Sequence, residues 1–233
     1  MNASNAEDPD AAPRARALAL RQEALRRGQE ERWFEALYRG SGGDMARVFW
    51  ADQVPNPNLT ARWEGWRVAL PRAPRVLVIG AGFGDDAAWM AARGARVWAF
   101  DLSPSAVGFA SQRFRAAPIH WFAGDLHALP LGPEVRFDLV LEVYTLQVIH
   151  PERRGEAMEA LASRVAPGGE LWVIARGRPD DTAPGDFPWP LGQGELTPLD
   201  RALERRSLEE FLDDEEPPAR RLVARYGRPG AAP

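Results

Sequence analysis

The chain has 233 residues, of which 45% are hydrophobic and 27% are charged, a composition that suits one folded domain with terminal extensions. It has no cysteine and a formal net charge of −4, which excludes disulfides, thiolate metal sites and a cysteine nucleophile and argues against a large surface for nucleic acid. No apolar run approaches the ~20 residues that span a bilayer, and the acidic, polar N-terminus is unlike a signal peptide, so we expect a cytoplasmic protein with no membrane or nucleic-acid partner.

The N-terminal region predicts helices and an aromatic loop. Residues 1–12 are polar, rich in alanine and proline and without periodicity, so we expect them to be disordered. Apolar residues recur at helical spacing over 14–38, and a further helix is predicted over about 58–70. Turn-forming residues separate these helices and leave Trp50 in a loop. We expect residues 13–70 to form N-terminal helices and an aromatic loop that covers a ligand site.

A glycine-dense stretch follows an apolar run in the sequence VLVIGAGFGDD, residues 76–86. The pattern predicts a buried strand, a tight loop with Gly80 and Gly82, and a helix over 87–93 whose N-terminus faces a ligand. Glycine has no Cβ, so it adopts positive φ and lets a ligand lie against bare backbone. The loop is therefore predicted to seat a cofactor.

The spacing of the glycines indicates which kind of cofactor is involved. The dinucleotide fingerprint requires a third glycine three residues after the second, and counting from Gly82 that position is Asp85. A carboxylate at this helix N-terminus would repel an anionic pyrophosphate. The pattern therefore disfavours a dinucleotide and is compatible with a cationic or zwitterionic ligand.

Strand and helix patterns alternate after residue 71 and predict the fold class. Strands are expected at 75–79, 95–100, 119–122, 137–141 and 170–175, and helices at 87–93, 105–115 and 151–165. Such alternation indicates an α/β fold with a mainly parallel sheet and helices on both faces. The tail predicts a helix at 198–205 and strands at 207–212 and 221–226, and residues 177–194 form a long loop of the kind that often faces a substrate.

Further features occur in the order of a known family. Asp101 ends the strand after the glycine loop, a glycine turn occurs at 166–169, and two strands close the tail. With the Gly-x-Gly-x-Gly loop, these features resemble the S-adenosylmethionine-dependent methyltransferases of the Rossmann-like, class I fold, and more loosely their thiopurine S-methyltransferase and tellurite-resistance branch. The resemblance covers about 50–226. It implies a Rossmann-like three-layer sandwich, a mainly parallel seven-stranded sheet with an antiparallel terminal hairpin strand, and an S-adenosylmethionine-binding domain over 71–229.

The resemblance implies cofactor-binding roles at the strand ends. Asp101 lies where a carboxylate accepts both donors of adjacent ribose hydroxyls; the alternative is an N-cap aspartate, or a strand-end aspartate with Ser103 taking the cap. Asp125 is implied to accept from the adenine amino group while Leu126 covers the ring; the alternative is an ordinary turn aspartate. The full predicted set is Trp50, Gly80, Ala81, Gly82, Asp85, Asp101, Leu102, Asp125, Leu126, Glu142 and Val143.

Two members of this set depend on the surroundings of their side chains. Glu142 follows directly after the fourth predicted strand, where it faces the ammonium of the methionyl group or, alternatively, lies in solvent. Enzymes similar to thiopurine S-methyltransferase fold an N-terminal tryptophan over the cofactor, and an aromatic face near a sulfonium gains about 0.5–2 kcal/mol. Trp50 has this role or, alternatively, anchors the N-terminal helices together with Trp33.

The predicted function is methyl transfer from S-adenosylmethionine to a small-molecule acceptor by in-line displacement, with S-adenosylhomocysteine as product. No catalytic base is nominated, because a base is optional when the acceptor is a thiolate or another soft anion, and no metal site is predicted. Phe187, Trp189 and Leu191 of the long loop are predicted to roof the acceptor pocket together with the N-terminal aromatic residues. The alternatives are a non-catalytic protein that binds the cofactor and, less favoured, a protein or RNA methyltransferase.

Overall fold

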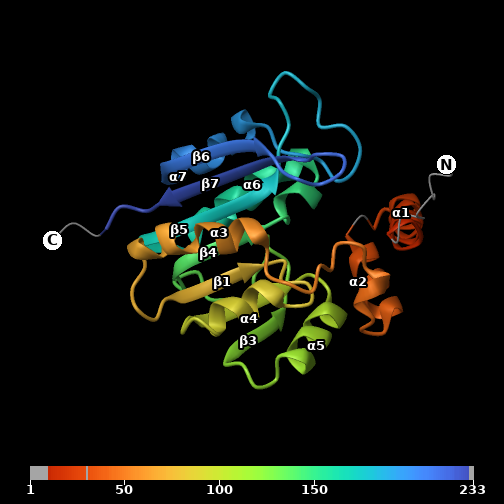
Figure 1. The fold of residues 1–233 in the computed structure, drawn as a ribbon, viewed down its shortest axis with the longest axis horizontal. Coiled ribbons are helices and arrows are strands. Elements are labelled where there is room, and N and C mark those ends of the chain that lie inside the picture. Colours follow the sequence, from red (N-terminus) through yellow and green to blue (C-terminus); the bar gives the residue numbers. More distant parts are fainter. Residues whose placement is uncertain (1–9, 30, 231–233) are drawn as a thin grey trace, which may run out of the picture.

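The computed structural model describes residues 10–29 and 31–230, and its centre is a seven-stranded sheet with the strand order β3-β2-β1-β4-β5-β7-β6 (Figure 1). Every neighbouring pair is parallel except for the pairs of β7, which is antiparallel to β5 and β6. The predicted Rossmann-like sandwich with an antiparallel terminal hairpin strand is confirmed. The strands are β1 Arg75–Ile79, β2 Arg96–Asp101, β3 Ile119–Ala123, β4 Phe137–Val143, β5 Val165–Arg176, β6 Glu204–Leu212 and β7 Arg220–Gly227.

Sequence signals explain where several helices begin. Proline occupies the first turn of α3, α5, α6 and α7, and the side chains of Asn56, Ser103 and His150 cap the first three of these. The segment predicted to be disordered, 1–12, lies mostly outside the described residues, and its last two residues belong to α1. In the described part of the chain, no helix is both long and apolar enough to cross a membrane. The helices are α1 Ala11–Arg26, α2 Arg32–Ser41, α3 Pro57–Trp66, α4 Asp85–Ala91, α5 Pro104–Arg113, α6 Pro151–Ser163 and α7 Thr197–Ala202.

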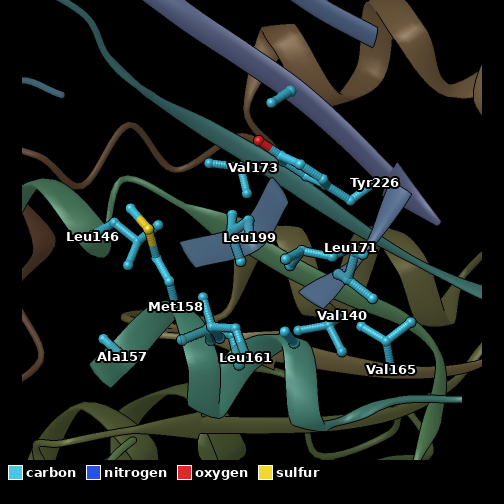
Figure 2. Close-up of a cluster of buried hydrophobic side chains, with 14 of the residues drawn as sticks. Val140, Leu146, Ala157, Met158, Leu161, Val165, Leu171, Val173, Leu199 and Tyr226 are labelled. Atoms are coloured by element: carbon cyan, nitrogen blue, oxygen red, sulfur yellow. The ribbon is translucent and has the colours of Figure 1, made fainter. Parts of the chain in front are cut away.

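Side chains of the strands alternate between two buried faces, because successive residues point to opposite sides of a sheet. Leu77 and Ile79 of β1 join the core that α6 and α7 cover, whereas Val76 and Val78 join the core under α3 and α4. Figure 2 shows the first of these cores, with Met158 extending from α6 toward Leu146 of the turn after β4. Each such side chain contributes roughly 1.5–3 kcal/mol when fully buried, so both layers of helices stabilise the sheet.

The N-terminal helices build a third core at the carboxyl edge of the sheet. Trp33, Leu37 and Tyr38 of α2 are at most 3% exposed, and they cluster with Phe83 of the glycine loop and Ala106 of α5. In Figure 1 the parallel strands point toward α1 and α2. The N-terminal region therefore lies at the edge of the sheet where α/β folds bind their ligands.

The glycine turn predicted at 166–169 lies within β5. The pairing of β4 with β5 shifts register between Phe137 and Leu139, and Gly168 has a φ of 75°. A Cβ on Gly169 would lie 2.9 Å from the Phe137 carbonyl oxygen. This turn therefore serves the close approach of two strands.

Candidate functional site

The glycine loop joins β1 to α4 at the carboxyl edge of the sheet. Gly80 and Gly82 have φ values of 59° and 52°, a region that other residues enter at a cost of ~1–2 kcal/mol. A Cβ on Gly80 would lie 2.2 Å from Thr145 Oγ1, so the turn after β4 packs directly on the loop. Ala81 donates its N–H to the Phe100 carbonyl at 2.8 Å, which ties the loop to β2.

Asp101 ends β2 and is held beside this loop. Its Oδ2 accepts the Gly82 N–H at 2.9 Å, and its Oδ1 accepts the Ser103 N–H at 2.9 Å. The helix cap belongs to Ser103, whose Oγ accepts the Ala106 N–H, so Asp101 does not serve as the cap. Burial raises the pKa of Asp101, whereas the two backbone hydrogen bonds favour its charged form. Each carboxylate oxygen keeps acceptor capacity for a ligand hydroxyl.

The turn after β3 contains Asp125 and Leu126, whose proposed contacts with adenine stay predictions. Asp125 Oδ1 accepts the His127 N–H at 2.8 Å, the bond of a turn aspartate. Leu126 is 8% exposed and packs in the core beneath α6. Leu102, which is 36% exposed, lines a cavity of about 570 Å³ together with Trp33. Of the two leucines, Leu102 therefore presents more of its side chain to open space.

Asp85 lies in the first turn of α4, where a negative charge suits the helix dipole. Arg113 of α5 forms an ion pair with it at 2.8 Å. This ion pair balances the negative charge of Asp85, which was expected to repel a pyrophosphate. A direct contact of Asp85 with the cofactor stays a prediction. Within residues 10–29 and 31–230, no group of three or more His, Cys, Asp or Glu side chains is placed to hold a metal ion.

Trp50 reaches the glycine loop through Tyr38, a residue that the sequence analysis missed. The Trp50 Nε1–H donates to the Tyr38 hydroxyl at 3.0 Å, and this hydroxyl lies 3.1 Å from the position of a Cβ on Gly82. Burial raises the pKa of Tyr38 and the Asp101 carboxylate adds to the effect, so the phenol stays neutral and keeps its proton. Trp50 also packs edge-on against Trp33, with ring centroids 5.8 Å apart. It therefore anchors the N-terminal helices and lies near the loop at the same time.

Glu35 of α2, one helical turn before Tyr38, was also missed and holds the other side of the site. Its carboxylate accepts from the Ser103 hydroxyl at 2.7 Å, the Ser105 N–H at 3.1 Å and the Ser105 hydroxyl at 2.9 Å. Although burial opposes it, these hydrogen bonds lower the pKa of Glu35. The spacing of a glutamate and a tyrosine on one helix face is the only sign of this arrangement in the sequence.

Glu142 is the penultimate residue of β4 and has 0% exposure, so the alternative of a solvent-exposed acid is wrong. The turn after β4 folds back over the carboxylate, and Oε1 accepts the N–H groups of Thr145 at 2.7 Å and Leu146 at 2.8 Å. Oε2 is buried and has no hydrogen-bond partner in the described part of the chain. Burial raises the pKa of Glu142 to about 7, while the two backbone hydrogen bonds and the Arg154 guanidinium oppose the shift. Val143, half-buried, points to the opposite face.

The long loop over 177–194 contacts the N-terminal aromatic residues. The Phe187 ring lies 5.3 Å from the rings of both Trp33 and Trp189, between centroids. Leu191, predicted in the roof, is instead 0% exposed in the core with α6 and α7. The Leu191 N–H donates to the carbonyl of Arg176, the last residue of β5, at 2.8 Å. The long loop therefore re-enters the core at Leu191.

Comparison with known proteins relates this edge of the sheet to a family. The family described as "Methyltransferase domain" matches residues 76–169. The uncharacterized methyltransferases Mb0092 of Mycobacterium bovis and Rv0089 of Mycobacterium tuberculosis are each 36% identical over 99 residues, which is 42% of this chain and 49% of the relative. The chain thus spans about half the length of the curated relatives it matches.

Solved structures share the fold over more of the chain. A structure described as "Conversion of a Disulfide Bond into a Thioacetal Group during Echinomycin Biosynthesis" has a TM-score of 0.67 at 20% identity and covers 86% of this chain and 92% of its own. The N-methyltransferase NodS of Bradyrhizobium japonicum WM9, in complex with S-adenosyl-L-homocysteine, has a TM-score of 0.59 at 23% identity. The match covers 75% of this chain and 89% of NodS. TehB of Haemophilus influenzae has a TM-score of 0.61 at 15% identity, and the match covers 74% of this chain and 62% of TehB.

Residues 76–169 therefore match a methyltransferase-domain family, and the sheet that contains them has the Rossmann-like fold of the class I methyltransferases that the sequence predicted. S-Adenosylmethionine is the cofactor of this class, and the side chains fit it. Gly82 offers bare backbone, Asp101 offers acceptors for two hydroxyls, and Glu142 Oε2 is a buried acceptor without a partner in the described part of the chain.

Substitution of Gly80 by alanine should weaken binding of S-adenosylhomocysteine by about tenfold or more, because the new Cβ would clash with Thr145 at 2.2 Å and displace the loop. Gly94→Ala is the matched control. Its φ of 86° is equally unfavourable, but nothing lies within 4 Å of its Cβ position, so only stability should fall, by ~1 kcal/mol. Calorimetric titration measures both affinities, and equal affinities would contradict this role of Gly80.

Glu142→Gln should change how stability depends on pH. The ordinary pKa of this carboxyl is 4.5 and its folded pKa is about 7, so the folded state binds the proton more tightly. The contribution of protonated Glu142 is fully present below pH 4.5 and is lost as pH rises to about 7; the loss is on the order of 3 kcal/mol. Urea unfolding between pH 4 and 8 should show the glutamine variant gaining stability relative to wild type over this window. A difference that is flat with pH would refute the assignment.

Proposed function

We propose that this chain is an S-adenosylmethionine-dependent methyltransferase that transfers a methyl group to a small-molecule acceptor by in-line displacement. One observation carries the proposal: the bare backbone of Gly82, the Asp101 carboxylate bonded to it and the Tyr38 hydroxyl meet at one edge of the sheet. S-Adenosylmethionine combines ribose hydroxyls, a carboxylate and an ammonium. The acceptors and the neutral phenol donor gathered here have the chemistry to bind these groups.

Recognition of the cofactor is divided among residues from different strands. Asp101 accepts from the ribose hydroxyls, and Asp125 accepts from the adenine amino group. Glu142 faces the ammonium with its unpartnered Oε2. Leu126 covers the adenine ring, and Trp50, held by its hydrogen bond to the N-terminal helix α2, covers the sulfonium side.

The surrounding residues favour an acceptor that is nucleophilic without a protein base. When bound, S-adenosylmethionine supplies a methyl group on a sulfonium whose departure leaves a neutral thioether, so no residue has to protonate the leaving group. His150 Nδ1 accepts the Glu152 N–H at 3.4 Å as the cap of α6, and burial raises the pKa of Tyr144. Neither is suited to remove a proton, and Glu142, the third candidate, is fully buried in β4. This supports a thiolate or another soft anion as acceptor.

The long loop supports an apolar acceptor of small size. Phe187 and Trp189 contact one another and the aromatic side chains of the N-terminal helices, and such a lining binds apolar molecules. The net charge of −4 gives no support to a nucleic-acid substrate. The neighbour whose description concerns conversion of a disulfide bond into a thioacetal group covers 86% of this chain, which makes thiols the first acceptors to test.

Calorimetric titration with S-adenosylmethionine, S-adenosylhomocysteine and NAD tests the cofactor. Asp101→Ala should weaken binding of the first two by about tenfold or more, since a hydrogen bond to a charged group contributes about 1.5–3 kcal/mol. Asp138→Ala is the matched control, because Asp138 also accepts a backbone N–H, that of Arg75 at 2.7 Å, but at the opposite edge of the sheet. Equal affinities of the two variants, or binding of NAD in place of S-adenosylhomocysteine, would sink the proposal.

Turnover is then measured as release of S-adenosylhomocysteine across a panel of thiols, amines, hydroxyls and metalloids. We expect release with at least one small thiol. Tight cofactor binding without release from any member of the panel would favour the non-catalytic alternative.

A further inference from the structure

Arg154 of α6 is a charged residue that the proposed methyl transfer does not use, yet it is only 1% exposed. An arginine tolerates such burial when its guanidinium is paired and hydrogen-bonded, because removing a charge from water is costly. The partners of Arg154 therefore show which parts of the protein it holds together.

The guanidinium joins two segments that are distant in the sequence. Nε donates to the Leu146 carbonyl at 3.0 Å, Nη2 donates to the Trp189 carbonyl at 2.9 Å, and Nη1 pairs with Glu195. Leu146 belongs to the turn after β4, whose Thr145 packs on the glycine loop. Trp189 belongs to the long loop, and Glu195 belongs to the short 3-10 helix Gln193–Leu196 that begins at the end of this loop. One side chain thus connects the cofactor side of the site with the loop above it.

Both polar groups of the Trp189 backbone are held. Its N–H donates to the Gln147 carbonyl at 2.8 Å, and its carbonyl accepts from Arg154. Gln147 is itself 6% exposed, and its side-chain oxygen accepts the Arg176 N–H at 2.7 Å. This part of the long loop is therefore fastened to the turn after β4.

The ring of Trp189 continues a row of aromatic side chains. It lies 5.2 Å from His150 and 5.3 Å from Phe187, between centroids. Phe187 lies 5.3 Å from Trp33, and Trp33 lies 5.8 Å from Trp50. The row runs from the long loop to the tryptophan that is hydrogen-bonded beside the glycine loop.

We propose that Arg154 is a positioning residue that sets Trp189, and through it Phe187, in the roof over the acceptor. The inference rests on the proposed function, which makes this row of rings the boundary of the acceptor pocket. A guanidinium donates along several fixed directions at once, whereas the ammonium of lysine donates from one point. Lysine at this position would keep the charge but would not hold the carbonyls of Leu146 and Trp189 together.

Fluorine NMR of the full chain labelled with 5-fluorotryptophan follows Trp189 without cofactor or acceptor, once Trp189→Phe and Trp172→Phe assign the two lines. In Arg154→Lys and Arg154→Met, the Trp189 line should shift or broaden, and the Trp189 amide should exchange about tenfold faster. The line of Trp172, which is 0% exposed in the other core, should stay in place.

Arg153→Met is the matched control, because the neighbouring Arg153 is exposed and pairs with Glu31 on the surface. Its Trp189 line should coincide with that of wild type. If the Arg154 variants do not fold, Glu195→Gln tests the same contact, because it removes the charge of the partner and keeps its shape. It should move the Trp189 line in the same way.

A Trp189 line that stays in place in folded Arg154→Met, or in Glu195→Gln, would overturn the proposal. A wild-type Trp189 line in Arg154→Lys would also overturn it, as would a shift of the Trp172 line equal to that of Trp189. For an acceptor that is turned over, Arg154→Met should raise KM about tenfold and change kcat by less than about threefold; the reverse pattern would also overturn it. Absence of S-adenosylhomocysteine binding overturns the proposed function but does not affect the NMR result, so the two failures are distinguishable.

Discussion

The hydrogen bond from the Gly82 N–H to Asp101 Oδ2, 2.9 Å long, is the interaction on which the rest of the site depends. It joins the ends of two neighbouring parallel strands where the backbone leaves the sheet, at the edge where α/β folds bind their ligands. A Cβ on Gly82 would lie 3.1 Å from the Tyr38 hydroxyl, and one on Gly80 would lie 2.2 Å from Thr145. The surrounding segments are thus packed against bare backbone, and this explains why the loop needs glycine.

The N-terminal helices are attached on both sides of that hydrogen bond. Tyr38 lies on the glycine loop, and Glu35 binds the two serines that follow Asp101 at the start of α5. Hydrogen bonds to a charged carboxylate contribute about 1.5–3 kcal/mol each, so α2 is fastened to the sheet edge at these points. The buried Arg154 makes a similar connection on the far side, between the turn after β4 and the long loop. The glycine loop, α2, the turn after β4 and the long loop therefore form one packed structure.

Local patterns in the sequence were sufficient to predict the fold, and they nominated the residues at the carboxyl edge of the sheet. Apolar runs typical of strands alternate with segments of helical periodicity, and Asp101 could be nominated because it directly follows a predicted strand. Tyr38 and Glu35 are not found, because their roles come from the packing of α2 on the sheet edge, about 45 to 70 residues away in the chain. The sequence predicts that Glu142 lies near a strand end, but it does not predict that Glu142 is buried. The burial arises because the following turn folds back and donates two N–H groups to the carboxylate.

The central claim is that Gly82 and Asp101 hold S-adenosylmethionine next to Tyr38. A crystal structure of the chain grown with S-adenosylhomocysteine tests it most directly. The account predicts ligand density across the glycine loop, with the ribose hydroxyls within hydrogen-bond distance of Asp101 and with Tyr38 and Trp50 against the ligand. Ligand density at another place, or none over the loop in crystals saturated with ligand, would contradict it.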